Sequence, residues 1–275
     1  MSVNYLLLVA SLVNERATPE NIFYYKGAEC DKVFSGVQTN IAPAEYVHSI
    51  LEREGESLEK IIILCSKEVL EKPLPNFDEE TSLQIFKRAV SSFSENSSRP
   101  LTEDDFVIIP HDVSGKSSVK QIYDKLNDVL FANPEREKKL FIDLTGGART
   151  ATLALLFAAR VFQNAGASVG GVYYGNITGN AGSLEKPATI EACTEIYDTF
   201  LLLEGQTDPR RAKKSMAAYS AKYLSAHSVN ALKEAEKHVE QQKTTIVTIE
   251  AHIDTSPIES SFEKAAVGPV VNRAK

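Results

Sequence analysis

Several patterns that would indicate a particular chemistry are missing from this chain of 275 residues. The three cysteines (Cys30, Cys65 and Cys193) lie far apart without metal-ligand spacing. They therefore predict reduced core residues of a cytoplasmic protein rather than disulfides or a metal site. The sequence has no Gly-x-Ser-x-Gly, His-Glu-x-x-His or Gly-x-Gly-x-x-Gly motif. It thus gives no support to a serine hydrolase, a zinc protease or a dinucleotide-binding enzyme, and we expect no metal and no cofactor.

Signals for membranes and for bulk nucleic-acid binding are lacking as well. The segment 1–5 has no basic region, and the apolar run 6–10 is too short for a secretory signal. The longest apolar stretch, 151–165, is interrupted by Arg160 and Gln163, so it predicts a core helix rather than a membrane span. The net charge of −7 does not attract DNA or RNA to the surface as a whole. We expect a cytoplasmic protein that binds neither membranes nor duplex DNA.

The chain instead alternates apolar strands with amphipathic helices. A hydrophobic content of 43% and a charged content of 24% are ordinary for a globular protein. Strands are predicted at 5–13, 61–65, 106–109, 140–144 and 169–174, with helices at 43–53, 81–94, 117–131 and 148–165 between them. This order predicts an α/β fold with a doubly wound, Rossmann-like, mostly parallel sheet. Residues 22–26 predict an edge hairpin or an insertion, and 189–196 an antiparallel edge strand.

The composition changes after Gly205. Two polar helices, 210–224 and 229–241, are predicted beyond it, and the pattern fades after Thr255. We therefore expect a ligand-binding domain at 1–205, followed by a small helical region at 206–275 for oligomerisation or coupling to an effector.

The glycine turn Thr145-Gly146-Gly147 is the most informative local feature. It joins the apolar run 140–144 to a long helix. The amino end of a helix presents unpaired N–H groups, and two glycines allow a ligand to approach them closely. Arg149 and Thr150 add a guanidinium and a hydroxyl. This pattern predicts a site for a phosphate or another anion at the carboxyl edge of the sheet. The alternative is that the glycines serve only to make a tight turn.

Other polar loops should reach the same edge, at 11–15, 66–67, 111–118 and 175–179. His111 is the one histidine predicted there. Gly115-Lys116-Ser117 resembles the end of a phosphate-binding P-loop, but Pro110 stands where the first glycine is required, which disfavours an NTPase. Either Lys116 contacts a phosphate, or the loop is solvated and Ser117 caps the next helix.

The loop Gln38-Thr39-Asn40-Ile41-Ala42-Pro43 is polar and leads into a helix. Uncharged amides and hydroxyls suit recognition of nucleobase edges. The simpler alternative is that Thr39 or Asn40 caps the helix.

The segment Asp143-Leu-Thr-Gly-Gly-Ala-Arg-Thr150, closing a strand–helix unit, resembles the signature of the CRISPR-associated Rossmann-fold (CARF) domain. The loop 37–43 and the polar turn 11–14 resemble other ligand loops of that family, and the likeness covers roughly residues 1–200. The resemblance implies a homodimer that binds a cyclic oligoadenylate, such as the tetra- or hexa-adenylate, across its two-fold axis in type III CRISPR antiviral defence.

The resemblance also implies which residues contact the ligand. Ser11 and Asn14 match the first loop, and Thr39 and Asn40 are the base readers. The glycine loop contributes Thr145, Gly146, Gly147, Arg149 and Thr150, while His111 and Lys116 are further candidates.

Many CARF proteins carry a ribonuclease of the HEPN type, marked by Arg-x4–6-His. This motif is absent here, and the nearest segment, 222–227, has lysine in place of arginine. Three functions stay open. The first is an allosteric receptor of cyclic oligoadenylate. The second is a metal-independent ring nuclease, in which a ribose 2′-OH attacks the adjacent phosphate and leaves a 2′,3′-cyclic phosphate, with Ser11, Thr145 and Arg149 as catalytic candidates. The third is a Rossmann-like nucleotide or phosphate binder outside CRISPR.

Overall fold

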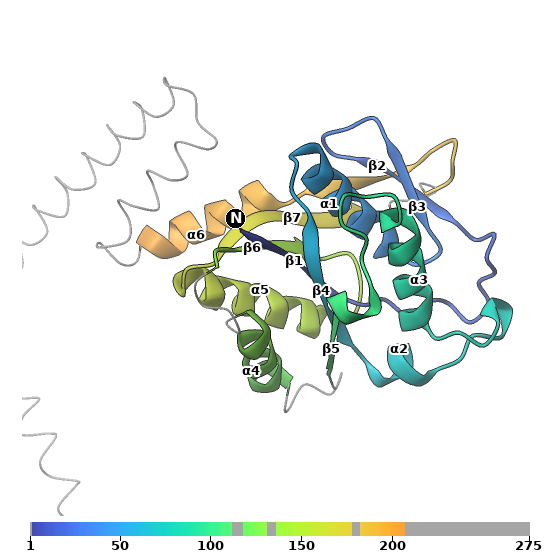
Figure 1. Cartoon of the computed structure of the whole chain (residues 1–275), viewed down its shortest axis with the longest axis horizontal. Coiled ribbons are helices and arrows are strands. Elements are labelled where there is room, and N and C mark those ends of the chain that lie inside the picture. Colours follow the sequence, from blue (N-terminus) through green and yellow to red (C-terminus); the bar gives the residue numbers. More distant parts are fainter. Residues whose placement is uncertain (1, 112–117, 131–135, 178–181, 207–275) are drawn as a thin grey trace, which may run out of the picture. The chain divides into compact units, whose positions relative to one another are not determined.

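The computed structural model describes residues 2–111, 118–130, 136–177 and 182–206 (Figure 1). The strands are β1 (Val3–Val9), β2 (Phe23–Gly27), β3 (Val33–Gly36), β4 (Leu58–Cys65), β5 (Phe106–Pro110), β6 (Lys138–Asp143), β7 (Ser168–Asn176) and β8 (Ala188–Ala192). The helices are α1 (Ile41–Arg53), α2 (Lys67–Glu71), α3 (Ser82–Ser94), α4 (Ser118–Leu130), α5 (Arg149–Asn164) and α6 (Thr194–Gln206), with short 3-10 turns at Pro75–Phe77 and Glu103–Asp105. The predicted segments 210–224 and 229–241 lie outside the described residues.

The eight strands form one sheet in the order β3-β2-β8-β7-β6-β1-β4-β5. The five strands from β7 to β5 are parallel, as each pair among them shows. The spatial order of these five strands, β5-β4-β1-β6-β7, is that of a Rossmann-like sheet. The predicted doubly wound α/β fold is therefore confirmed. β2 and β3 form an antiparallel hairpin inserted between β1 and α1.

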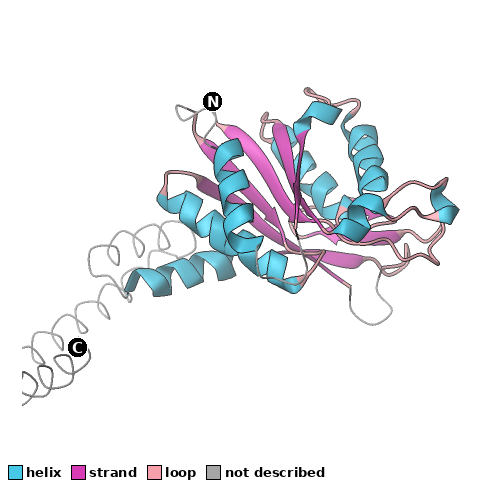
Figure 2. Ribbon diagram, turned by 90° about the horizontal axis from the view of Figure 1, so that it is seen from below, coloured by secondary structure: helices cyan, strands magenta, loops and turns pink. Residues whose placement is uncertain are grey.

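Helices cover both faces of the sheet, as Figure 2 shows. α1 and α3 contact each other on one face, and α4 and α5 contact each other on the opposite face. β1 is buried along its whole length, as expected for a strand covered on both sides. No described helix is both long and apolar enough to cross a lipid bilayer.

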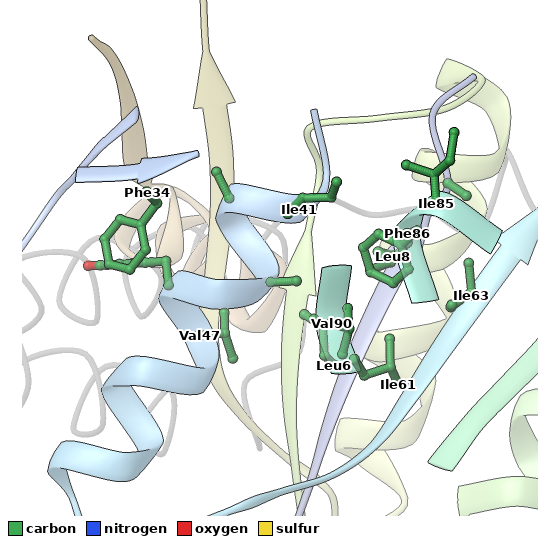
Figure 3. Packing of buried hydrophobic residues seen from close by; sticks show 14 of the residues in the cluster. Leu6, Leu8, Phe34, Ile41, Val47, Ile61, Ile63, Ile85, Phe86 and Val90 are labelled. Atoms are coloured by element: carbon green, nitrogen blue, oxygen red, sulfur yellow. The ribbon is translucent and has the colours of Figure 1, made fainter. Parts of the chain in front are cut away.

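The core between the sheet and the α1–α3 layer is built from aliphatic and aromatic side chains (Figure 3). Leu6 and Leu8 of β1 and Ile61 and Ile63 of β4 face the same side because strand side chains alternate. Phe86 of α3 packs into this layer with no exposed surface. α3 begins with a capping box, in which the Thr81 side chain and the Gln84 side chain satisfy each other's backbone N–H groups. This core fixes the strand ends from which the site is built.

Three expectations from the sequence need correction. β8 pairs antiparallel with β7, as predicted, but it lies inside the sheet because β2 pairs with its other side. The second half of the predicted strand 189–196 belongs to α6. Of the three cysteines only Cys65 is buried, whereas Cys30 and Cys193 are partly exposed; all three are free thiols.

The predicted core helix, α5, is buried on one face only. Leu153, Phe157 and Val161 are exposed to 53%, 60% and 43%. The spacing of four residues places these side chains in one stripe along the helix. Apolar content alone did not distinguish a helix buried all round from one with a second apolar face.

Candidate functional site

The order of the strands changes direction between β1 and β6. The chain continues from β1 to β4 and β5 on one side, and from β6 to β7 on the other. At such a point the connecting loops diverge, and a crevice opens outside the carboxyl ends of the strands. The loops that follow β1 and β6 both lie at this point, so the topology brings the predicted loop at 11–14 next to the glycine turn.

Close packing explains both glycines of the turn. Gly147 has φ +78°, in the left-handed region, and a Cβ added there would overlap the side chain of Val9. A Cβ on Gly146 would overlap the amide of Asn40. Gly146 is buried, whereas Gly147 is exposed. The turn is thus pressed against β1 and the start of α1, and side chains larger than hydrogen do not fit without movement.

The Ser11 loop is fastened to the segment that precedes α1. The Ser11 backbone N–H donates to Oδ1 of Asn40 at 2.7 Å, and the Ser11 carbonyl accepts from Nε2 of Gln38. The Thr39 hydroxyl donates to Oγ of Ser11 at 2.9 Å. These contacts place the Ser11 side chain at a defined position beside the glycine turn.

A buried carboxylate connects this segment to the glycine turn. Asn40 donates through Nδ2 to Oδ2 of Asp143 at 2.6 Å, and the Thr145 backbone N–H donates to Oδ1 of Asp143 at 2.8 Å. The Gly175 N–H donates to the Thr145 hydroxyl at 2.7 Å, which ties in β7. Asn40 and Asp143 have no exposed surface. Asn40 and Thr145 therefore bind the carboxyl group directly, and the Ser11 loop and β7 are joined to it through these two residues.

Burial raises the pKa of the Asp143 carboxyl from its ordinary 3.8 to about 6, although hydrogen bonds from Thr145 and Asn40 oppose the shift. The titratable neighbour Tyr25 is also fully buried; burial, and to a smaller extent the charge of Asp143, raise the pKa of its phenol. This carboxyl accordingly titrates in the mildly acidic range.

The raised pKa gives a testable dependence of stability on pH. Since the folded pKa exceeds the unfolded one, the stabilising contribution of Asp143 is fully present below about pH 4 and is lost as the pH rises through about 6. Relative to an Asp143→Asn variant, which cannot titrate, the free energy of unfolding of the wild type should fall by about 2 kcal/mol between pH 4 and pH 7. Urea unfolding of both proteins at the two pH values measures this. A difference that is constant with pH would contradict the shift.

Two cavities flank the Ser11 loop. The smaller, of about 300 Å³, lies over the carboxyl ends of the parallel strands. Its lining includes Ser11, Ser66, His111 and Gly147. The larger, of about 530 Å³, lies between the Ser11 loop, the start of the β2–β3 hairpin and the segment before α1. Its lining is largely apolar, with polar groups from residues that include Asn14, Arg16, Gln38 and Thr39. Leu12 borders both cavities.

The amino end of α5 lies at the smaller cavity, and no side chain of the helix caps its free N–H groups or offsets its positive dipole. Ala148 occupies the N-cap and offers no side-chain cap, and the first turn holds no acidic residue. Arg149 and Thr150 in that turn are exposed. The positive end of the helix dipole thus lies next to the glycine turn, and Arg149 adds a positive charge in the first turn of the helix, a combination that favours an anion.

The structure brings most of the predicted residues together. Ser11, Thr39, Asn40, Thr145, Gly146 and Gly147 form one contacting group, with Arg149 and Thr150 on the adjoining turn. His111 joins them through the smaller cavity, while Asn14 is exposed and borders the larger one. Lys116 lies outside the described residues.

Two parts of the site were not among the predicted residues. Asp143 carries the connection between the loops, and Gln38 holds the Ser11 carbonyl. The signal for Asp143 was present, since an acidic residue ends a strand that is otherwise apolar and buried. No group of three or more His, Cys, Asp or Glu side chains within the described ranges is placed to hold a metal ion.

The fold defines an α/β protein of the Rossmann-like class, with a cavity at its topological switch point. No family model matches the sequence, and no curated protein matches it either. Among solved structures, the chain is similar to Enterococcus italicus Csm6 bound to cyclic hexa-2′-fluoro-hexa-dAMP, with a TM-score of 0.45 and 8% sequence identity. That alignment covers 93% of this chain and 60% of the other, so the chain spans three fifths of that structure.

Proposed function

We propose that this chain is a receptor for a cyclic oligoadenylate in type III CRISPR defence, and that it binds the ring across the two-fold axis of a homodimer. The observation that carries the proposal is the junction of the Ser11 loop, the Thr39–Asn40 segment and the glycine turn at the switch point. All three segments carry the resemblance to CARF domains, and they are far apart in the sequence.

The chemistry of the junction suits a nucleotide. Phosphates would bind at the amino end of α5, where Arg149 supplies a positive charge and exposed Gly147 permits close approach. The larger cavity offers apolar walls, among them Leu12, Ile22 and Phe23, which suit the faces of a base. In this arrangement Ser11 lies between the two regions, because its loop borders both cavities.

The exposed stripe on α5 supports the homodimer. Leu153, Phe157 and Val161 begin one turn beyond Arg149 and continue along the helix. An exposed apolar stripe of this kind suits a contact with another protein. A second copy of the chain, docked through the same stripe, would place two glycine turns on either side of one symmetry axis, which fits a ligand with internal two-fold symmetry.

Calorimetric titration with cyclic tetra-adenylate and cyclic hexa-adenylate tests the proposal. We expect one ring bound per two chains for one of the two ligands. Binding of neither ring would sink the proposal and leave an ordinary nucleotide or phosphate site at the glycine turn.

Arg149→Ala should weaken that binding at least about a hundredfold, because a charged hydrogen bond to a phosphate contributes about 1.5–3 kcal/mol and a ring held by two chains loses two of them. Arg136→Ala is the matched control. This arginine precedes β6, at the opposite end of that strand from the glycine turn, and it pairs with Glu59. Equal losses in the two variants would mean that net charge, not the position of Arg149, determines affinity.

Cleavage of the ring is the second candidate function. The Ser11 loop, His111 and Gly147 line the same cavity, so a hydroxyl and an imidazole lie close to the proposed phosphate site. Ser11, Thr145 and Arg149 would position the ribose 2′-OH for attack and stabilise the charge on the phosphate. Chromatography of the ligand recovered from the titration separates the functions: an intact ring indicates a receptor alone, and linear products indicate a ring nuclease.

A further inference from the structure

Asn40 and Asp143 form a pair whose hydrogen bonds have a fixed direction. From the Ser11 loop inwards, the Ser11 N–H donates to Asn40, Asn40 donates to Asp143, and the Thr145 N–H donates to the other oxygen of Asp143. Both outer groups are backbone donors, so the pair must present an acceptor at each end. One amide and one carboxylate, with a single donor between them, meet this requirement.

We propose that Asn40 and Asp143 are positioning residues, forming a hydrogen-bond relay that couples the Ser11 loop to the glycine turn so that the two loops hold the ligand as one unit. The inference rests on the proposed function, in which the ligand contacts both loops. In this proposal Asn40 supports the ligand loops instead of contacting a base as the sequence had suggested. Its side chain is fully buried, and both its oxygen and its nitrogen are hydrogen-bonded within the protein.

Single substitutions should break the relay in opposite ways. In Asp143→Asn, two amide groups face each other, and turning either amide directs a donor against the backbone N–H of Ser11 or Thr145. In Asn40→Asp, two carboxylates face each other in a buried position, so they repel each other unless they take up a proton, which costs free energy at neutral pH. In Asp143→Asn a buried polar group has no complementary partner, and at neutral pH each variant therefore disfavours the observed loop positions.

Exchange of the two residues should restore the relay. With Asp at position 40 and Asn at 143, the Ser11 N–H donates to the carboxylate, the amide at 143 donates to its other oxygen, and the Thr145 N–H donates to the amide oxygen. Every donor again meets an acceptor, and the total charge is unchanged. If Asn40 and Asp143 only filled space or balanced charge, the two single variants would not both lose the loop positions while the double exchange keeps them.

The test compares wild type, Asn40→Asp, Asp143→Asn and the double exchange. We expect the amide hydrogens of Ser11 and Thr145, followed by NMR, to exchange with solvent at least about tenfold faster in the single variants, and ligand affinity to fall by at least about tenfold. The double exchange should recover both to within a few-fold. Asn4→Asp is the control, since Asn4 is a buried amide at the amino edge of the sheet, bonded to Glu56 and Ser57; it should leave the Ser11 and Thr145 amides unchanged.

A double exchange as impaired as the single variants would overturn the relay, and so would single variants that behave as wild type. Failure of the proposed function is distinguishable from this. If the wild type binds no cyclic oligoadenylate, the receptor proposal fails, while the exchange rates of the two amides still decide whether the relay exists.

Discussion

Replacement of Gly147 by alanine should lower the free energy of unfolding by about 2–5 kcal/mol and remove measurable binding of the cyclic ligand. Two costs add. The left-handed backbone at φ +78° disfavours any residue with a Cβ by about 1–2 kcal/mol. Overlap of that Cβ with the Val9 side chain adds about 1–3 kcal/mol and displaces the turn from β1. Urea unfolding and calorimetric titration measure the two effects.

Gly55 provides a matched control for the backbone cost. It has φ +71°, close to the value at Gly147, and nothing lies within 4 Å of an added Cβ. Gly55→Ala should therefore cost about 1–2 kcal/mol and leave ligand affinity unchanged. If both substitutions destabilise equally, the contact with Val9 is not what holds the turn in place.

If the proposed homodimer forms through α5, Phe157→Glu should convert it to a monomer and abolish binding of the proposed cyclic ligand. An aromatic side chain at the centre of an interface typically contributes about 2 kcal/mol or more, and a two-fold interface contains it twice, so the dimer dissociation constant should rise about a thousandfold. The introduced carboxylates would also lose water on association. Sedimentation velocity over a concentration series, with and without ligand, measures the change.

Val33→Glu is the control for a surface charge introduced at an apolar position. Val33 is 42% exposed, begins β3 at the edge of the sheet and lines neither cavity. It should leave both association and binding unchanged. A Phe157→Glu protein that remains dimeric would place the subunit contact elsewhere than on α5.

The glycine turn and its neighbours could be predicted because their signals are local. An apolar run, two glycines and an alanine-rich helix follow one another directly between residues 140 and 165. Parallel strands then bring the loops at their carboxyl ends to one edge of the sheet. The same reasoning placed Ser11, Thr145 and His111 at that edge. The periodicity of apolar side chains was sufficient to identify the strands and helices, and thereby the loops at this edge.

Long-range pairing and the use of buried polar groups could not be predicted in this way. The position of β8 depends on β2, and no local pattern in either segment specifies the other. Asn40 was predicted to cap a helix or to contact a base. It does occupy the N-cap position of α1, but its side chain makes no capping hydrogen bond and is hydrogen-bonded to Ser11 and Asp143 instead. The exposed face of α5 likewise depends on which helices pack beside it, and apolar composition does not record that.

The parallel pairing of β2 with β8 also has a consequence for the biogenesis of the protein. Tyr25 is paired with Ala188, so most of the domain separates the two strands along the chain. Such a pairing has a high contact order. The chain loses the entropy of closing a long loop before the contacts between the two strands can stabilise the pairing. On the ribosome the β2–β3 hairpin emerges early but cannot dock against β8 until the end of the domain has been synthesised. The segment with Thr39 and Asn40 follows that hairpin directly and contacts Asp143 at the end of β6, so the proposed ligand site cannot be complete before most of the domain has been synthesised.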